Sequence, residues 1–136
     1  MTVKDVMSSK VCTVTRSDTA ADAARVMNKY DIGSVPVVEN ENLCGIITDR
    51  DIVIRCIAGG RQPDMCKIND IMSPATATVT SEQSLAEAER LMSNAQVRRL
   101  PVVASGRLEG IVSLADIARI RPTAEIAKTL SEISMP

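Results

Sequence analysis

The sequence contains no histidine, tryptophan or phenylalanine, and Tyr30 is its single aromatic residue. Without aromatic side chains a protein has no platform on which to stack bases, so single-stranded nucleic acid is not an expected ligand. Without histidine, the commonest general base is missing. The sequence also has no P-loop and no nucleophile–base pair at a readable spacing. We therefore expect a protein that is not an enzyme.

The charge is nearly balanced, with 16 Lys and Arg residues against 17 Asp and Glu residues, which gives a net charge of −1. This balance gives no electrostatic attraction to duplex nucleic acid or to an anionic membrane. No apolar run approaches the roughly 18 residues of a membrane span, and the first residues, 1–5, lack a signal-peptide pattern. We expect a cytoplasmic protein without a nucleic-acid or membrane partner.

The four cysteines, Cys12, Cys44, Cys56 and Cys66, form no C-x-x-C pair. A zinc site would need all four thiolates from scattered positions, because no histidine is available. We expect four reduced and mostly buried thiols, and no metal or cofactor. A redox disulfide, for example between Cys12 and Cys44, stays an open alternative.

The sequence repeats itself. Shifting the chain by 65 positions aligns residues 3–52 with residues 68–117 without a gap, and 18 of the 50 aligned positions are identical. Such a repeat predicts two copies of one structural unit, each burying a face that it cannot cover alone. We expect copy one at 1–60, a linker at 61–67, copy two at 68–121 and a C-terminal helix or tail at 122–136.

Each copy is predicted to be an α/β unit with the order strand, helix, strand, strand, helix. The first strand–helix–strand step should be a right-handed crossover that makes a parallel pair, and the hairpin adds an antiparallel neighbour. In copy one we expect a leading turn at 3–7, strands at 12–15, 35–38 and 43–47, and helices at 19–29 and 48–58. In copy two we expect the leading turn at 68–72 and the strands at 76–80, 100–103 and 108–112.

The helix stripes follow from apolar residues spaced three and four apart. Copy one has Ala20, Ala23, Ala24 and Met27, and copy two has Leu85, Ala88, Met92 and Ala95. Ser17 and Ser84 lie near the expected helix caps.

After Pro122 a third helix is expected from Thr123 to Ile133, with Ile126, Leu130 and Ile133 on one face. This stripe either covers the protein's own core or forms a dimer contact. Because a small two-layer unit leaves helical faces to cover, we expect a homodimer in solution.

A hydroxyl residue and an aspartate three positions later recur at the start of the last helix of each copy. They are Thr48 and Asp51 in copy one, and Ser113 and Asp116 in copy two. One interpretation is a capping box, in which the two side chains bond to the backbone of their own turn. The other is a nucleotide clamp, since a helix start with a hydroxyl suits phosphate and a carboxylate can accept from ribose hydroxyls.

The repeat, the Val-Pro-Val-Val strand and the Gly-Ile-Ile-Thr-x-x-Asp step resemble the tandem cystathionine-beta-synthase (CBS) domain pair, or Bateman module, over residues 3–120. The layout resembles that of stand-alone bacterial two-CBS proteins of the hypoxic-response type. The resemblance implies a pseudo-twofold pair with two clefts between the repeats that bind AMP, ADP, ATP or a related adenosyl compound. It places phosphate near Thr48 and Ser113, and ribose at Asp51 and Asp116.

The family also uses the residues just before the strand proline, which are Gly33 and Ser34 in copy one and Arg98 and Arg99 in copy two. If the latter face the Thr48 cleft, that cleft gathers three guanidinium groups with Arg50, and arginine holds phosphate through paired hydrogen bonds. We therefore expect the phosphorylated ligand at Thr48 and Asp51. A solvated strand end is the alternative for Arg98 and Arg99.

Adenine would lie against aliphatic walls, although ordinary core packing is the favoured interpretation for most of these residues. The walls are Val14, Ile32 and Val35, with Val79, Val97 and Leu100 opposite.

The leading hypothesis is a non-catalytic sensor that binds an adenine nucleotide and regulates an unidentified partner protein. The alternative is a dimeric interaction or stress protein whose clefts are vestigial.

Overall fold

Two helices of equal length begin at hydroxyl residues that are equivalent in the repeat. Helix α1 (Ala20–Tyr30) follows Thr19, and α4 (Leu85–Ala95) follows Ser84, and each side chain accepts a hydrogen bond from the third helical N–H. The cap of α1 therefore lies at Thr19, two residues after the expected Ser17, whereas Ser84 is the cap of α4. Hydroxyl side chains satisfy N–H groups that the first helical turn leaves without a partner.

The computed structural model describes residues 1–121 and 123–135, so Pro122 and Pro136, the ends of the expected tail at 122–136, lie outside the described residues. In this part of the chain no helix has the length and apolar character needed to cross a membrane.

Each copy contains the predicted antiparallel hairpin. Strand β1 (Ser34–Glu39) pairs with β2 (Asn42–Thr48), and β3 (Arg99–Ala104) pairs with β4 (Arg107–Ser113). Both hairpins carry an irregularity at the same repeat position, between the two valines after the proline. The two turns are tight, and all four central residues have φ between 49° and 81°.

The short strands expected at 12–15 and 76–80 are reduced to one bridging residue each. Val14 pairs in parallel with Val37, and Val79 pairs in parallel with Val102. The parallel direction is confirmed, but the predicted length is wrong. The next donor along the ladder would be the backbone nitrogen of Pro36 or of Pro101, and proline has no N–H.

The helix expected at 48–58 changes its geometry part-way. A short α2 (Asp49–Asp51) leads into a π-helix, η2 (Ile52–Ile57), in which the N–H of Ala58 donates to the carbonyl of Val53 at 2.9 Å. The equivalent helix of copy two, α5 (Leu114–Ala118), has no such segment. The predicted helix is present, but its π-helical part was not predicted, since hydrophobic spacing does not distinguish the two hydrogen-bond patterns.

The chain folds as two units, and each contains a segment from the other copy. Unit 1 comprises Met1–Val11 and Thr76–Pro136, and unit 2 comprises Cys12–Ala75. The 3-10 helix η1 (Val3–Asp5), which leads copy one, therefore belongs to the unit of copy two, and α3 (Ile68–Ile71), which leads copy two, belongs to the unit of copy one. The expected boundaries at 60, 67 and 121 describe the sequence repeat, and the units exchange its leading segments.

The exchanged segments are buried and hydrogen-bonded. Val3 is fully buried in the core of unit 1, and Ile68 and Ile71 are 0% and 1% exposed in the core of unit 2. The two copies also make the same pair of backbone hydrogen bonds: Ser8 exchanges them with Ile111, and Ser73 exchanges them with Ile46.

Glycine makes this approach possible. A Cβ atom on Gly45 would stand 2.6 Å from the carbonyl oxygen of Ser73, and one on Gly110 would stand 2.5 Å from that of Ser8. These are the places where a backbone must come closer than a side chain allows.

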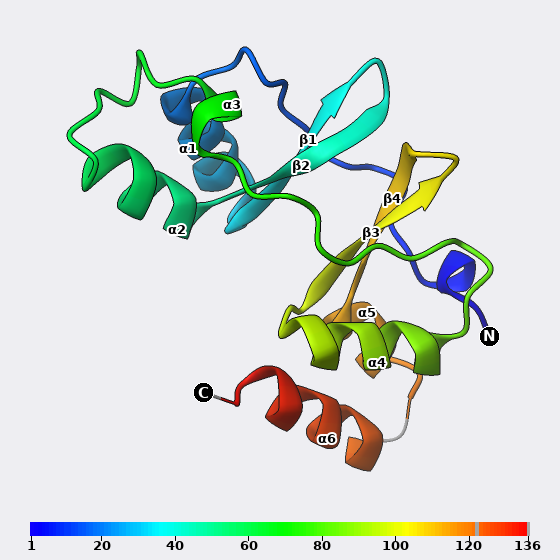
Figure 1. Ribbon diagram of the computed structural model, residues 1–136. Helices are drawn as coiled ribbons and strands as arrows, with labels where there is room; N and C mark the ends of the chain where they lie inside the picture. Colours follow the sequence, from blue (N-terminus) through cyan, green and yellow to red (C-terminus); the bar gives the residue numbers. More distant parts are fainter. Residues whose placement is uncertain (122, 136) are drawn as a thin grey trace. The chain divides into compact units, whose positions relative to one another are not determined.

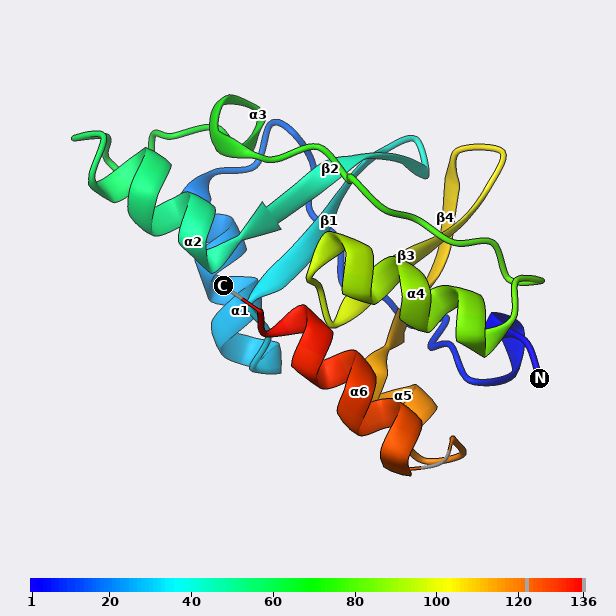
Figure 2. The same ribbon diagram turned by 60° about the horizontal axis from the view of Figure 1, so that its bottom comes forward.

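Helix α6 (Thr123–Ile133) lies along α4 in unit 1 (Figures 1 and 2). Ile133 is buried in the core of unit 1 and Ile126 packs against it, whereas Leu130 is 38% exposed. Two residues of the expected stripe thus cover the core.

The exposed face of α1 differs from the equivalent face of α4. Ala24, expected to be buried, is exposed, while its repeat counterpart Glu89 is 6% exposed and pairs with Arg121 at 2.9 Å. The other expected core residues of α1, Ala20, Ala23 and Met27, are buried.

The exchange of leading segments between the two copies predicts which fragment of the chain folds on its own. Fragment 12–75 contains the whole core of unit 2, whereas fragment 1–60 has similar length but lacks Cys66, Ile68 and Ile71. Burial of each isoleucine contributes about 1.5–3 kcal/mol, which is comparable to the total stability of so small a domain. We expect fragment 12–75 to melt cooperatively by circular dichroism and fragment 1–60 not to. Equal cooperativity of the two fragments would contradict the exchange.

Candidate functional site

The motif residues of each copy lie at the junction between a strand and a helix. Thr48 ends β2 and caps α2, and Ser113 ends β4 and caps α5. We call residues 48–51 the Thr48 entrance and residues 113–116 the Ser113 entrance.

In both entrances the hydroxyl and the carboxylate bond to the backbone of their own turn. The N–H of Asp51 donates to Thr48 Oγ1 and the N–H of Thr48 donates to Asp51 Oδ2, both at 3.0 Å. Ser113 and Asp116 make the same two bonds at 3.1 Å. The capping-box interpretation is thus correct as a description of local structure.

The capping box alone does not mark a binding site, because it occurs twice more. Thr2 with Asp5 begins η1, and Thr19 with Asp22 begins α1. The backbone N–H of Thr19 lowers the pKa of the Asp22 carboxyl by stabilising its charged form. A functional role for the two entrances must therefore rest on the groups around them.

The second carboxylate oxygen has different partners in the two entrances. Asp51 Oδ1 accepts a hydrogen bond from Ser73 Oγ at 2.9 Å, and Arg55 Nε lies 3.9 Å from it. Asp116 Oδ1 accepts instead from Arg119 at 3.0 Å. The Asp51 side chain is 9% exposed and that of Asp116 is 22% exposed, and the side chain of Arg119 is 74% exposed. The carboxylate of Asp116 is thus held by a partner that solvent or a ligand can displace.

The hydroxyl groups of Thr48 and Ser113 each keep an O–H that is free to donate a hydrogen bond. Thr48 Oγ1 and Ser113 Oγ accept the bonds given above, and within residues 1–121 and 123–135 neither donates to another group. Since a hydroxyl can accept and donate at once, each can still donate to a ligand oxygen.

The residues before the strand proline lie beside the entrance of their own unit. Ser34 is the strand partner of Thr48, and Arg99 is the strand partner of Ser113. The carbonyl of Gly33 accepts from Asp49 N–H at 2.9 Å, and the carbonyl of Arg98 accepts from Leu114 N–H at 2.8 Å. Within each unit, the pre-proline residues are therefore adjacent to the motif residues.

The predicted cluster of three guanidinium groups would combine Arg50 of unit 2 with Arg98 and Arg99 of unit 1. This cluster stays a prediction. The three side chains share one property. In the described part of the chain none of them has an ion-pair or hydrogen-bond partner, whereas Arg25, Arg61, Arg90, Arg119 and Arg121 pair with carboxylates.

The six predicted adenine-contacting residues fall into two cores. Val14 and Val35 are buried in unit 2, and Val79 and Leu100 are buried in unit 1. Only Ile32 in unit 2 and Val97 in unit 1 are half-buried at the core margin. Core packing accounts for four of the six residues, and Ile32 and Val97 retain surface for a ligand.

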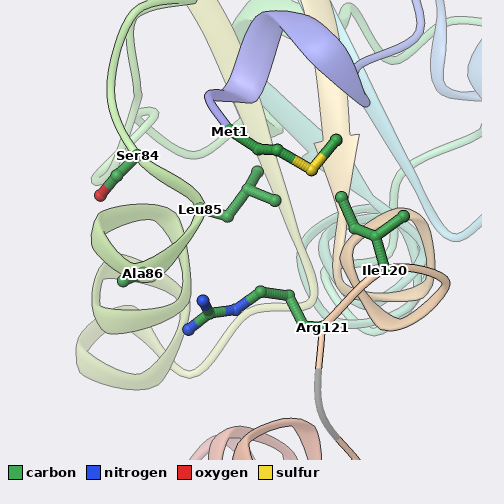
Figure 3. Close-up of a pocket in the computed structure, with 6 residues that line it drawn as sticks. All are labelled: Met1, Ser84, Leu85, Ala86, Ile120 and Arg121. Atoms are coloured by element: carbon green, nitrogen blue, oxygen red, sulfur yellow. The ribbon is translucent and has the colours of Figure 1, made fainter.

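A pocket of about 360 Å³ lies in unit 1 beside the start of α4. Figure 3 shows Arg121 reaching toward α4 below Leu85, with Met1 and Ile120 above it. The pocket contains none of the predicted site residues, and its one charged side chain is already paired with Glu89 and Glu125.

The protein-family comparison matches the two sequence repeats. The model for the CBS domain matches residues 3–57 and again residues 68–123. The chain belongs to the CBS domain family. It is 36% identical to Hypoxic response protein 1 of Mycobacterium tuberculosis over 136 residues, which is 99% of this chain and 95% of that protein.

Solved structures of CBS proteins share the fold. A crystal structure of Hypoxic Response Protein I with two coordinated zinc ions is 37% identical, with a TM-score of 0.82, covering 90% of this chain and all of that one. The crystal structure of CBSX2 in complex with AMP is 26% identical, with a TM-score of 0.74, and covers 87% of this chain and 93% of that one. Among the described residues of this CBS protein, no three His, Cys, Asp or Glu side chains are grouped closely enough to hold a metal ion.

Sequence reasoning missed Ser73 as a partner of Asp51. The serine is one of the identical positions of the CBS repeat, and its counterpart is Ser8. The copies nevertheless use it differently, since Ser8 Oγ approaches the carbonyl of Lys10 at 3.4 Å. Identity within the repeat could have identified the residue but not its partner.

The difference between the two serines gives a matched pair of variants. In Ser73→Ala, a poorly exposed carboxylate oxygen loses its hydrogen bond, and we expect the free energy of unfolding to fall by about 1–3 kcal/mol. In Ser8→Ala the lost contact is exposed, and we expect a change below about 0.5 kcal/mol. Urea denaturation measures both. Equal losses for the two variants would show that the bond to Asp51 contributes no extra stability.

Proposed function

We propose that this CBS pair is a non-catalytic regulatory module that binds an adenosine nucleotide such as AMP, ADP or ATP. The observation that carries the proposal is that each unit has a helix entrance whose hydroxyl keeps a free donor, and that Arg50 in unit 2 and Arg98 and Arg99 in unit 1 have no side-chain partner among the described residues. The AMP complex of the CBSX2 relative supports this ligand class.

The chemistry of each group suits a part of the nucleotide. The hydroxyl and first-turn N–H groups offer donors to phosphate, and arginine adds charge-assisted bonds. The aspartate can accept from the two ribose hydroxyls because a carboxylate has about four acceptor positions, of which two or three are used here. Ile32 and Val97 offer apolar surface to adenine.

The two entrances differ in charge. The Thr48 entrance has Arg50 and Arg55 close to Asp49 and Asp51, whereas the Ser113 entrance has Arg98, Arg99 and Arg119 close to Asp116. The sequence favours Thr48 as the phosphate site, and the contacts within unit 1 favour Ser113. Binding at either entrance would stabilise the folded pair and could bias its contacts with a regulated protein.

Isothermal titration calorimetry with AMP and with ATP tests the proposal. We expect Asp51→Ala or Asp116→Ala to weaken binding by at least about tenfold, because the ribose loses charge-assisted hydrogen bonds. A loss in Asp51→Ala supports the site that the sequence favours, and a loss in Asp116→Ala supports the site beside Arg98 and Arg99.

The control is Asp22→Ala, which removes an equivalent capping carboxylate at α1. We expect it to bind nucleotide as the wild type does, with thermal melting of each variant establishing that it is folded. Unchanged affinity in both entrance variants, or no binding by the wild type, would contradict the proposal.

We also propose that the protein is a homodimer, and η2 supplies the observation that favours this. Val53, Ile54 and Ile57 are between 51% and 55% exposed on this helix. Apolar side chains gathered on one surface helix are typical of an association site.

Light scattering after size exclusion distinguishes this surface from α6. We expect Ile54→Glu to convert a dimer into a monomer and Leu130→Glu to leave the dimer intact. A monomeric wild type at micromolar concentration, or dissociation by Leu130→Glu alone, would contradict an interface at η2.

A further inference from the structure

Two of the four thiols lie together inside unit 2 and have no part in the proposed nucleotide site. Cys56 is 0% exposed and Cys66 is 1% exposed, and both belong to the core that contains Ile68 and Ile71. Burial, together with the proximity of the Cys66 thiol, raises the pKa of Cys56. Cys12 and Cys44, in contrast, are only partly buried.

A single loop joins the two cysteines. The chain leaves η2 after Ile57, passes through residues 58–67 and reaches α3 (Figure 1), and of residues 58–65 only Pro63 is not exposed. The remaining bonds of the thiols are weak: Cys56 Sγ donates to the carbonyl of Arg61 at 3.7 Å, and Cys66 Sγ to that of Lys67 at 4.0 Å. The loop itself is held by the bond from Ala21 N–H to the Pro63 carbonyl at 3.0 Å and by the ion pair of Arg61 with Asp70 at 3.2 Å, so exposing the sulfur atoms requires local unfolding of the loop.

Each of the two cysteines lies in a segment that leads to a contact with Asp51. On the side of Cys56, Arg55 lies near Asp51 and donates to the carbonyls of Ile71 and Met72 at 3.3 and 3.2 Å. On the side of Cys66, the chain continues through α3 to Ser73, which donates to Asp51. A bond between the sulfur atoms would fasten these segments to each other.

We propose that Cys56 and Cys66 are a redox-active dithiol that a small disulfide, such as oxidised glutathione, converts into an intramolecular disulfide. One thiolate attacks a sulfur of the oxidant, forms a mixed disulfide and releases one glutathione thiolate. The second cysteine then attacks the mixed disulfide, the Cys56–Cys66 bond forms and a second glutathione thiolate leaves. The protein loses two electrons and two protons, and the two glutathione molecules take them up.

The environment sets the rate and the consequence of this reaction. The thiolate is the reactive form, so the dithiol reacts only when the loop opens and the pair meets water. Once formed, the disulfide constrains the loop of residues 57–65 and restricts the unfolded chain. This consequence is independent of whether a nucleotide binds.

Trypsin makes the bond directly observable, since Arg55, Arg61 and Lys67 place the two thiols in separate peptides, 56–61 and 62–67. The full chain is incubated with oxidised glutathione, alkylated, digested and examined by mass spectrometry. We expect these two peptides to be joined, with a mass lower by two hydrogen atoms than their sum. The double variant Cys12→Ser/Cys44→Ser should give the same product.

Thermal melting provides the second measurement. We expect oxidation to raise the Tm by roughly 5–10 °C, and this rise to be absent in Cys66→Ala. If Cys66→Ala does not fold, the peptide map of the wild type decides alone. Alkylated or glutathione-bound Cys56 and Cys66 after full oxidation of Cys12 and Cys44 would overturn the proposal.

Discussion

The structure depends on a reciprocal burial in which the leading turn of each repeat completes the core of the other. Val3 and Ile68 enter these cores from equivalent positions of the sequence, and Gly110 and Gly45 let the following backbone approach a strand closely enough to bond to it. Because the core of each unit is incomplete without residues from the other repeat, the two repeats depend on each other for stability. The same exchange brings Ser73 to Asp51, so it also shapes a candidate ligand site.

The two copies show how a repeat with one backbone design can diverge at its functional positions. Both entrances form the same capping box with bond lengths that agree within 0.1 Å. Their surroundings differ: Asp51 is nearly closed off by Ser73, while Asp116 is held by an exposed arginine and lies in the unit that carries Arg98 and Arg99. Under the proposed function, this asymmetry predicts that one entrance binds the nucleotide more strongly than the other.

Local features of the fold were predictable from the sequence, because they depend on residues close together in the chain. The caps at Thr48, Ser84 and Ser113, the hairpin turns and the helix at 123–133 follow from hydroxyl, turn and apolar spacing. The exchange of leading segments was not predictable, since it depends on contacts between residues far apart in the chain, such as Ser73 with Ile46 and Ser8 with Ile111, that leave no local pattern. The sequence pattern also did not predict the π-helix, which is a difference in hydrogen-bond geometry. It did not predict the exposure of Ala24, because α6 packs along α4, the counterpart of α1 in copy two.

The proposed nucleotide site accounts for two features of the described residues: the capping hydroxyls keep a free donor, and Arg99, the strand partner of Ser113, has no side-chain partner. An NMR titration of the isotope-labelled protein with AMP tests it most directly, because each backbone amide reports separately. We predict saturable shifts of the amides in at least one entrance, Thr48–Asp51 or Ser113–Asp116, and in the pre-proline residues beside it. Shifts confined to other regions, or no shifts at millimolar AMP, would contradict this interpretation.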